Sequence, residues 1–139
     1  MIIMQMIVQQ FVEWTKKKIR HHSETEKRIY FREKEIWWAA LGKNIGCEAD
    51  GKNELFERPV LILKKYSKEM CFILPLTTQI KSVRPWYQAL VLIDGKDNAI
   101  NISQGRVISC RRLLRKMTVL SDGDYEMVFD QFIRSFNKK

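Results

Sequence analysis

Between residues 36 and 120 the chain alternates short apolar runs with polar turns, and this alternation restricts the fold more than any other feature. The Asp94-Gly95 pair supplies the positive φ angles of a tight hairpin, which favours antiparallel pairing. In a domain of this size we expect the strands to close into a small barrel, because closure removes exposed sheet edges. The runs with the length and composition of strands are 36–41, 59–63, 71–76, 86–93, 99–102, 106–110 and 117–120.

An amphipathic helix is predicted before the first strand. From Ile3 to about Arg20, apolar residues recur every three or four positions. We expect this helix to pack against the barrel, because Phe11 and Trp14 would otherwise expose large apolar groups to water. The hydrophilic segment from residue 21 to 26 breaks the pattern. Residues 1–30 are therefore predicted as a helix with a linker.

The barrel domain, residues 31–139, is predicted to end in a second helix. Ser121 is placed as its N-cap, and Asp124 follows three residues later, where the positive end of the helix dipole favours a carboxylate. Leu120 and Tyr125 have the spacing of a hydrophobic staple. The apolar stripe is interpreted as core packing and consists of Tyr125, Val128, Phe129, Phe132, Ile133 and Phe136.

The net charge of +9 is concentrated in the middle of the chain. Residues 58–118 hold 12 basic and 3 acidic side chains, whereas residues 1–57 hold 10 and 9. Such a field attracts polyanions, and nearby Trp86, Tyr87 and Gln79 can stack on or hydrogen-bond bases. Nucleic acid is the favoured partner, with an acidic protein or a merely solubilising surface as alternatives. The residues that line either an RNA groove or a solvated barrel edge are Arg106, Arg111, Arg112, Arg115 and Lys116.

Several classes of protein are excluded. The three cysteines are odd in number and lack C-x-x-C spacing, which argues against a disulfide framework or a zinc site. No stretch approaches the roughly 18 apolar residues of a membrane span, and the first basic cluster follows the apolar start, the reverse of a secretory signal. We expect a cytoplasmic protein that binds no membrane, metal or cofactor. The long connection from Gly42 to Glu57 is predicted to be exposed. A solvated loop is the default interpretation and a binding loop or lid is a functional hypothesis, whereas the spacing of its four carboxylates matches no calcium or magnesium loop.

Five ordered segments of the chain resemble the MazF/PemK (Kid) toxins. The resemblance covers about residues 32 to 136 and leaves the first helix outside. The chain departs from the family pattern at Cys47, Ala49, Asp50 and Ser109, and it has extra residues from 52 to 57. The segments are 35–41 (EIWWAAL), 46–51 (GCEADG), 58–62 (RPVLI), 75–80 (PLTTQI) and 102–113 (ISQGRVISCRRL).

This resemblance implies an SH3-like small β-barrel of the Kid/MazF/CcdB type, mainly β with additional helices, and a homodimer. It also implies a sequence-specific, metal-independent endoribonuclease (mRNA interferase) that cuts single-stranded RNA. A cognate antitoxin protein would inhibit the enzyme, and the toxin–antitoxin complex would bind operator DNA. Arg58 falls on the family's catalytic arginine and Thr77 on its catalytic threonine. The expected substrate-binding residues are Asn44, Glu48, Gln79, Lys81, Arg84 and Arg106.

The chemistry of Arg58 and Thr77 is consistent with RNA cleavage. The 2′-hydroxyl of RNA can attack the adjacent phosphorus, so a protein needs only to align the attack and stabilise the added charge. A guanidinium fork stabilises that charge, and a threonine hydroxyl holds the in-line geometry. His21 and His22 lie in the predicted linker outside the barrel, so no general base is assigned. The alternatives are a gyrase-poisoning toxin of the CcdB type and a non-catalytic SH3-like binding module.

Overall fold

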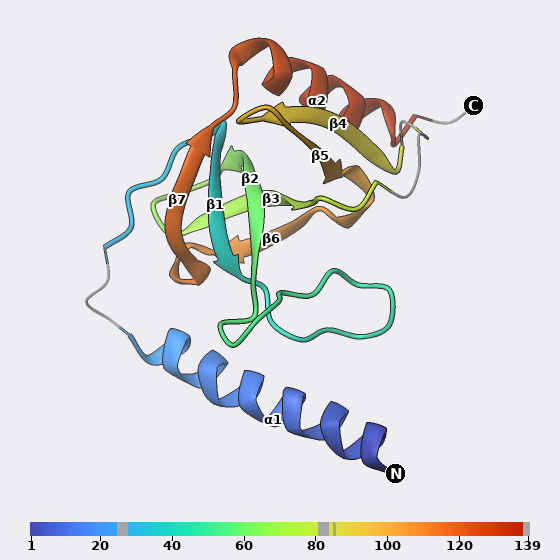
Figure 1. Ribbon diagram of the computed structural model, residues 1–139. Coiled ribbons are helices and arrows are strands. Elements are labelled where there is room, and N and C mark those ends of the chain that lie inside the picture. The colour runs from blue at the N-terminus through green and yellow to red at the C-terminus, as the bar shows by residue number, and fades with distance from the viewer. Residues whose placement is uncertain (25–27, 81–83, 85, 138–139) are drawn as a thin grey trace.

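The computed structural model describes residues 1–24, 28–80, 84 and 86–137, which form seven strands and a helix near each terminus. All seven predicted runs are confirmed as strands. The two α-helices lie at opposite ends of the molecule (Figure 1). The elements are α1 (Ile2–Ser23), β1 (Glu35–Ala40), β2 (Glu57–Lys65), β3 (Met70–Thr77), β4 (Gln88–Ile93), β5 (Lys96–Asn101), the 3₁₀-helix η1 (Ile102–Gln104), β6 (Arg106–Ser109), the 3₁₀-helix η2 (Cys110–Arg112), β7 (Leu113–Val119) and α2 (Asp122–Arg134).

Every strand pair in the sheet is antiparallel, as predicted, and the strand order is β4-β5-β3-β2-β1-β7 with β6 on β3. β4 and β5 form the predicted hairpin, with φ angles of 51° at Asp94 and 76° at Gly95. β3 connects the two halves of the sheet, because its first residues pair with β6 and its last two, Leu76 and Thr77, pair with β5.

The three central strands β1, β2 and β3 are buried on both faces. Alternate residues such as Ile36 and Leu61 belong to a core cluster that α2 covers, where the Tyr125 hydroxyl donates a hydrogen bond to the Leu63 carbonyl at 2.6 Å. Their neighbours belong to a second cluster on the opposite face, which includes Trp37. This burial explains why these strands appear as continuous apolar runs rather than as alternating patterns.

α2 begins as the sequence predicts. The Ser121 Oγ accepts a hydrogen bond from the Asp124 N–H at 3.2 Å, and Tyr125 is buried. The prediction that the whole apolar stripe is core is wrong for its end: Ile133 is 49% exposed and Phe136 is 72% exposed. The helix ends at Arg134, so Phe136 follows the last turn and packs edge-on against the Phe132 ring at the surface.

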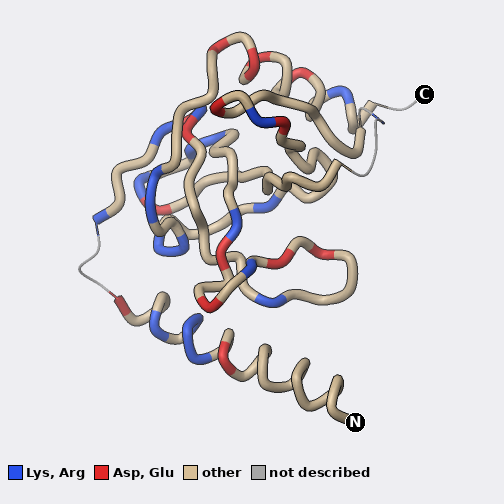
Figure 2. Tube along the Cα trace, in the orientation of Figure 1, with Lys and Arg blue, Asp and Glu red and all other residues tan. Residues whose placement is uncertain are grey.

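α1 packs against the barrel through one large residue. Trp14 is 6% exposed and lies 5.7 Å from the Phe56 ring, and Phe11 is half-buried. The predicted packing is therefore confirmed for the second half of α1. The apolar side chains from Ile2 to Val8 are exposed instead, because this half of the helix extends beyond the barrel. Figure 2 shows that it carries no charge, whereas basic residues crowd the end of α1.

No helix in the described ranges combines the length and the apolar character needed to cross a membrane.

Candidate active site

The connection between β1 and β2, residues 41–56, forms a loop whose two ends are hydrogen-bonded to each other. Gly42 adopts a φ of 87°, which only glycine tolerates readily, and its N–H donates to the Phe56 carbonyl at 3.1 Å. The Gly51 N–H donates to the Gly42 carbonyl at 2.8 Å, and Lys52 bridges to Glu57. These backbone contacts hold both ends of the loop together, so its far end extends from the barrel as one unit (Figure 1).

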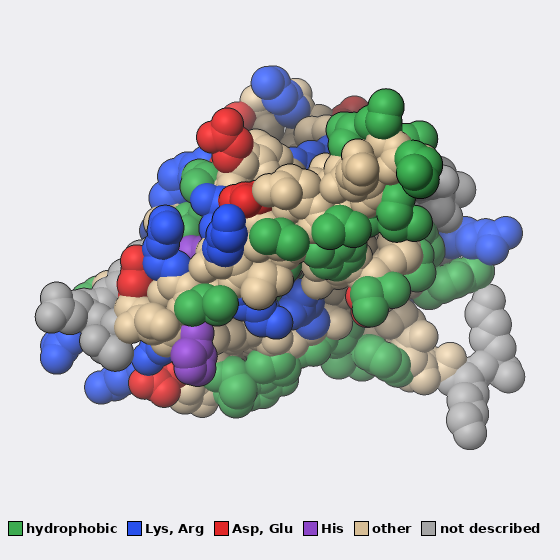
Figure 3. Space-filling model, turned by 90° about the horizontal axis from the view of Figure 1, so that it is seen from below, with side chains coloured by type: hydrophobic (Ala, Val, Ile, Leu, Met, Phe, Trp, Pro, Cys, Tyr) green, Lys and Arg blue, Asp and Glu red, His purple; other side chains and the backbone are tan. Residues whose placement is uncertain are grey.

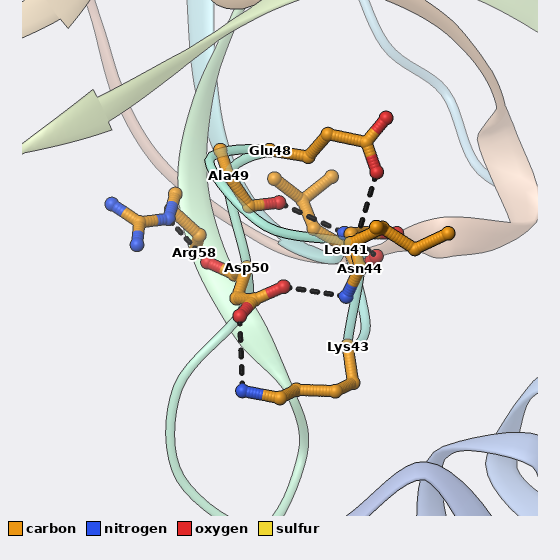
Figure 4. A network of polar contacts seen from close by, with 8 residues as sticks. Leu41, Lys43, Asn44, Glu48, Ala49, Asp50 and Arg58 are labelled. Atoms are coloured by element: carbon orange, nitrogen blue, oxygen red, sulfur yellow. Dashed lines mark hydrogen bonds and ion pairs between the residues drawn. The ribbon is translucent and has the colours of Figure 1, made fainter.

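Asp50 organises the interior of this loop (Figure 4). Its Oδ1 accepts from the Asn44 N–H at 2.5 Å, and its Oδ2 lies 3.2 Å from the Lys43 Nζ. The Asn44 Nδ2 donates to the carbonyls of Leu41, at 3.2 Å, and Ala49, at 2.8 Å. Asn44, a predicted substrate-binding residue, is thus engaged in loop structure and does not line the cavity described below.

Arg58 lies where the loop enters β2, and the surrounding backbone fixes its side chain. The Nε donates to the Asp50 carbonyl at 2.5 Å, and the Nη1 donates to the Leu76 carbonyl at 3.2 Å. Burial lowers the pKa of Arg58, and the Asp50 carboxylate partly opposes this change. An arginine remains charged at neutral pH despite such a shift, so the structure holds a half-buried, oriented cation here.

Thr77, at the end of β3, lies near Arg58. The β2–β3 pairing reaches Val60 opposite Pro75, two residues from each side chain, and the Arg58 Nη1 contacts the carbonyl of Leu76, the residue before Thr77. The Thr77 Oγ1 accepts a hydrogen bond from the Gln79 N–H at 3.1 Å, which leaves its own hydrogen available to donate.

A cavity of about 300 Å³ contains both residues. It lies between the loop, the adjoining ends of β2 and β3, and η1. Four predicted site residues come together in its lining: Arg58, Thr77, Glu48 and Gln79. The remaining lining residues are Gly46, Cys47, Ala49, Asp50, Lys52, Tyr87, Gln88, Asn101, Ser103 and Gln104.

The cavity contains polar residues to which the sequence analysis gave no role. Gln88 is buried, and its Nε2 donates to the Asn101 Oδ1 at 2.9 Å. Gln104 connects η1 to the loop: its Oε1 accepts from the Ala49 N–H at 3.2 Å and its Nε2 donates to the Cys47 carbonyl at 3.0 Å. Gln104 belongs to the segment 102–113 that carries the family resemblance, so the sequence could have identified it as a candidate site residue. Nothing in the sequence around Gln88 marks it as a site residue.

Two other predicted substrate-binding residues, Arg84 and Arg106, do not line this cavity. The Arg84 guanidinium lies 5.8 Å from the centre of the Trp86 ring, outside the cavity lining. Arg106 begins β6 and pairs with Ile73 in the sheet. Lys81 lies outside the described residues.

Two of the basic residues considered for an RNA groove are engaged in ion pairs with buried glutamates. The Arg115 guanidinium contacts both carboxylate oxygens of Glu57, at 2.8 and 3.0 Å, and this pairing lowers the pKa of Glu57. The Lys116 Nζ lies 3.0 Å from Glu35. Burial alone would raise the pKa of Glu35, but hydrogen bonds from Trp37 and from neighbouring groups lower it overall. These pairs support the β1–β2 and β1–β7 region of the barrel.

No group of three or more His, Cys, Asp and Glu side chains in the described ranges is arranged to hold a metal ion. The prediction that His21 and His22 belong to a linker is wrong: both lie in the last turn of α1, and they line a different cavity.

Fold and sequence together define a toxin of a type II toxin–antitoxin system. A family model described as "PemK-like, MazF-like toxin of type II toxin-antitoxin system" matches residues 32–136. The chain therefore belongs to the PemK-like, MazF-like toxin family, and α1 precedes the matched region.

A solved structure supports the same fold. The chain is similar to the Mycobacterium tuberculosis toxin MazF-mt6, with a TM-score of 0.55 and 16% identity over 73% of this chain and 95% of that chain. At this identity the likeness shows the fold alone. A second structure, described as an Mtb toxin, gives a TM-score of 0.49 and 17% identity over 57% of this chain and 92% of that chain. A comparison with curated proteins gives no match.

Proposed function

We propose that this toxin is a metal-independent, sequence-specific endoribonuclease that cleaves single-stranded RNA. One observation carries the proposal: Arg58, at the start of β2, and Thr77, at the end of β3, line the same cavity. Membership of a toxin family supports it, because cleavage of messenger RNA is a direct way to stop protein synthesis.

Arg58 stabilises the charge that develops on the phosphate. Attack of a 2′-hydroxyl on the adjacent phosphorus produces a pentacoordinate phosphorane with an additional negative charge. Two guanidinium nitrogens of Arg58 are engaged by backbone carbonyls, so the group is already oriented and the remaining N–H donors can bind phosphate oxygens. Preorganised donors of this kind are worth about 10²- to 10³-fold in rate.

Thr77 and Glu48 serve the nucleophile in this proposal. The Thr77 hydroxyl donates to a phosphate oxygen or to the 2′-oxygen and keeps the attack in line. Glu48 is one of two carboxylates in the lining, and its Oε1 accepts from the Ile45 N–H at 2.9 Å. The other carboxylate, Asp50, has both oxygens engaged inside the loop. The second oxygen of Glu48 is therefore the acceptor for the 2′-hydroxyl proton.

The test uses purified wild-type protein, free of antitoxin, and a long unstructured RNA with and without EDTA. We expect cleavage in both conditions, with a 2′,3′-cyclic phosphate at the 3′ end of each upstream fragment. Arg58→Ala should reduce the rate at least about 10²-fold, whereas Arg134→Ala, an exposed arginine at the end of α2, should not. Intact RNA under both conditions would reject the proposal, and gyrase inhibition without RNA cleavage would indicate the CcdB-type alternative.

The family implies an antitoxin partner. We further propose a homodimer in the cytoplasm, inhibition of RNA cleavage by the antitoxin, and binding of operator DNA by the toxin–antitoxin complex. Size-exclusion chromatography with light scattering tests the dimer, and addition of the co-encoded antitoxin to the cleavage reaction tests the inhibition.

A further inference from the structure

A second, larger cavity of about 840 Å³ lies between the end of α1 and the barrel. Its walls come from the last turns of α1, from residues 28–30, from the β2–β3 turn and from η2. This volume falls in the range of sites that enclose small ligands, roughly 300–1,000 Å³. Because α1 and residues 28–30 precede the part of the chain that the family model matches, the cavity combines the toxin barrel with an element outside that match.

The lining is strongly basic. Its ionised residues include a single carboxylate, Glu69, which lies on the β2–β3 turn. Within the described residues none of the lining cations forms an ion pair, in contrast to Arg115 and Lys116, which are paired with buried glutamates. Figure 3 shows Lys and Arg side chains gathered around histidine at this end of the molecule, with hydrophobic side chains toward the other end. The lining cations are Lys18, Arg28, Lys65, Lys68, Arg111 and Arg112.

Three of these cations are held in place by backbone carbonyls, and one of them is Lys65, whose Nζ donates to the Phe31 carbonyl at 2.8 Å. The Arg112 Nη1 donates to the Ala40 carbonyl at 3.0 Å, and the Arg111 Nη1 donates to the His22 carbonyl. Burial and the nearby charge of Arg106 lower the pKa of Arg112, so its guanidinium lacks full solvation. A bound anion would compensate for that loss, and each guanidinium has further N–H donors to offer.

An aromatic side chain stands beside the cations. Tyr30 lines the cavity and is 81% exposed. An exposed ring next to phosphate-binding groups is the usual arrangement for stacking an unpaired base. An acidic peptide would use the cations but has no need of the ring, so the combination favours nucleic acid.

We propose that this basic pocket binds backbone phosphates of single-stranded RNA, with a base stacked on Tyr30, as a second contact site for the substrate. The choice of RNA as the ligand rests on the proposed function. Arg112 contacts the last residue of β1, Ala40, shortly before the loop that lines the catalytic cavity. An RNA strand that occupies the catalytic cavity can therefore continue around the root of the loop into the basic pocket.

The test measures binding of a fluorescein-labelled 2′-O-methyl RNA of mixed sequence, which the protein cannot cleave, by fluorescence anisotropy. The pocket variant is Lys18→Glu/Lys68→Glu, and the control is Arg20→Glu/Lys96→Glu, which removes the same charge from α1 and the barrel at exposed positions outside the pocket. We expect the pocket variant to bind about tenfold more weakly and to lower the salt slope of log K by about 1.4, for two lost phosphate contacts. The control should change affinity less than threefold.

Equal affinity of the pocket and control variants would overturn the proposal. Displacement of the RNA by poly-L-glutamate as effectively as by unlabelled RNA would do the same and would indicate an acidic protein ligand. If the pocket variant does not fold, Tyr30→Ala provides the test, with an expected loss of about fivefold or more. The probe cannot be cleaved, so this assay measures binding separately from cleavage. If the protein binds the probe through the pocket but cuts no RNA, only the endoribonuclease proposal is rejected. Cleavage with unchanged binding in the pocket variant would reject only the second site.

Discussion

Replacement of Gly42 tests how α1 is attached to the loop that lines the candidate active site. A Cβ at Gly42 would lie 2.0 Å from the Trp14 Cε2 and 2.3 Å from its Cζ2, so the indole ring must leave its site. Gly42→Ala should therefore cost the packing of Trp14 as well as the strain of a positive φ. Removal of a buried tryptophan costs about 3–5 kcal/mol, and the left-handed backbone costs an alanine about 1–2 kcal/mol. We expect a loss of roughly 4–7 kcal/mol in the free energy of unfolding.

Gly95 offers a matched control. Its φ of 76° is similar to the 87° of Gly42, but a Cβ there meets no atom within 4 Å. Gly95→Ala should consequently cost only the backbone strain, about 1–2 kcal/mol. Trp14→Ala should cost about 3–5 kcal/mol. In the Trp14→Ala background, Gly42→Ala should cost no more than Gly95→Ala, because the ring that obstructs the new methyl group is already gone.

The assay is urea unfolding followed by far-UV circular dichroism for the single variants, the Trp14→Ala/Gly42→Ala double variant and the Gly95→Ala control. The double variant should be about as stable as Gly42→Ala alone, which corresponds to a coupling free energy of about 3 kcal/mol or more. Additive effects at Trp14 and Gly42, or equal costs at Gly42 and Gly95, would refute the contact. Limited proteolysis near the linker gives an independent measure of α1 release.

Three further predictions concern stability. The lowered pKa values of Glu35 and Glu57 stabilise the fold above the unfolded value of 4.5, and this contribution is lost as the pH falls through the folded values. Thermal melts from about pH 6 to about pH 3 should therefore show a steeper loss for the wild type than for Glu57→Gln. Ser121→Ala removes the cap of α2 and should cost about 1 kcal/mol in urea unfolding; no change would exclude the cap. Tyr125→Phe removes a buried hydrogen bond and should cost about 1–2 kcal/mol, and a neutral result would contradict that bond's contribution.

The sequence predicted the strands well because most of the apolar runs reflect burial. The run 117–120 is an exception, since Met117 is 41% exposed and Val119 is 53% exposed. The first and last residues of the strands were harder to predict from the sequence. β5 begins at Lys96, three residues before the predicted start at Ala99, because pairing with β4 extends the ladder over polar residues that have little intrinsic preference for a strand. The pairing of β3 with β2, β5 and β6 depends on contacts between distant segments and leaves no local signal.

The candidate site was partly predictable for the same reason. Arg58 and Thr77 lie in ordered segments that resemble a family, so the sequence alone was enough to propose their positions. Gln88 and Gln104 enter the cavity only because separate strands converge there, and nothing about a glutamine at either position signals a site. Asn44 was predicted to bind substrate, but its side chain stabilises the loop by donating hydrogen bonds to two loop carbonyls.

The helix α1, which precedes the region that the family model matches, packs against the loop between β1 and β2. They meet where Trp14 packs at 5.7 Å from the Phe56 ring, directly beside the loop neck formed by Gly42 and the Phe56 carbonyl. Without Phe56 the Trp14 ring would lose an aromatic partner, and without α1 the Phe56 ring and the neck would face water. The helix therefore supports the loop that carries the candidate site, so deletion of residues 1–22 should lower both thermal stability and any RNA cleavage.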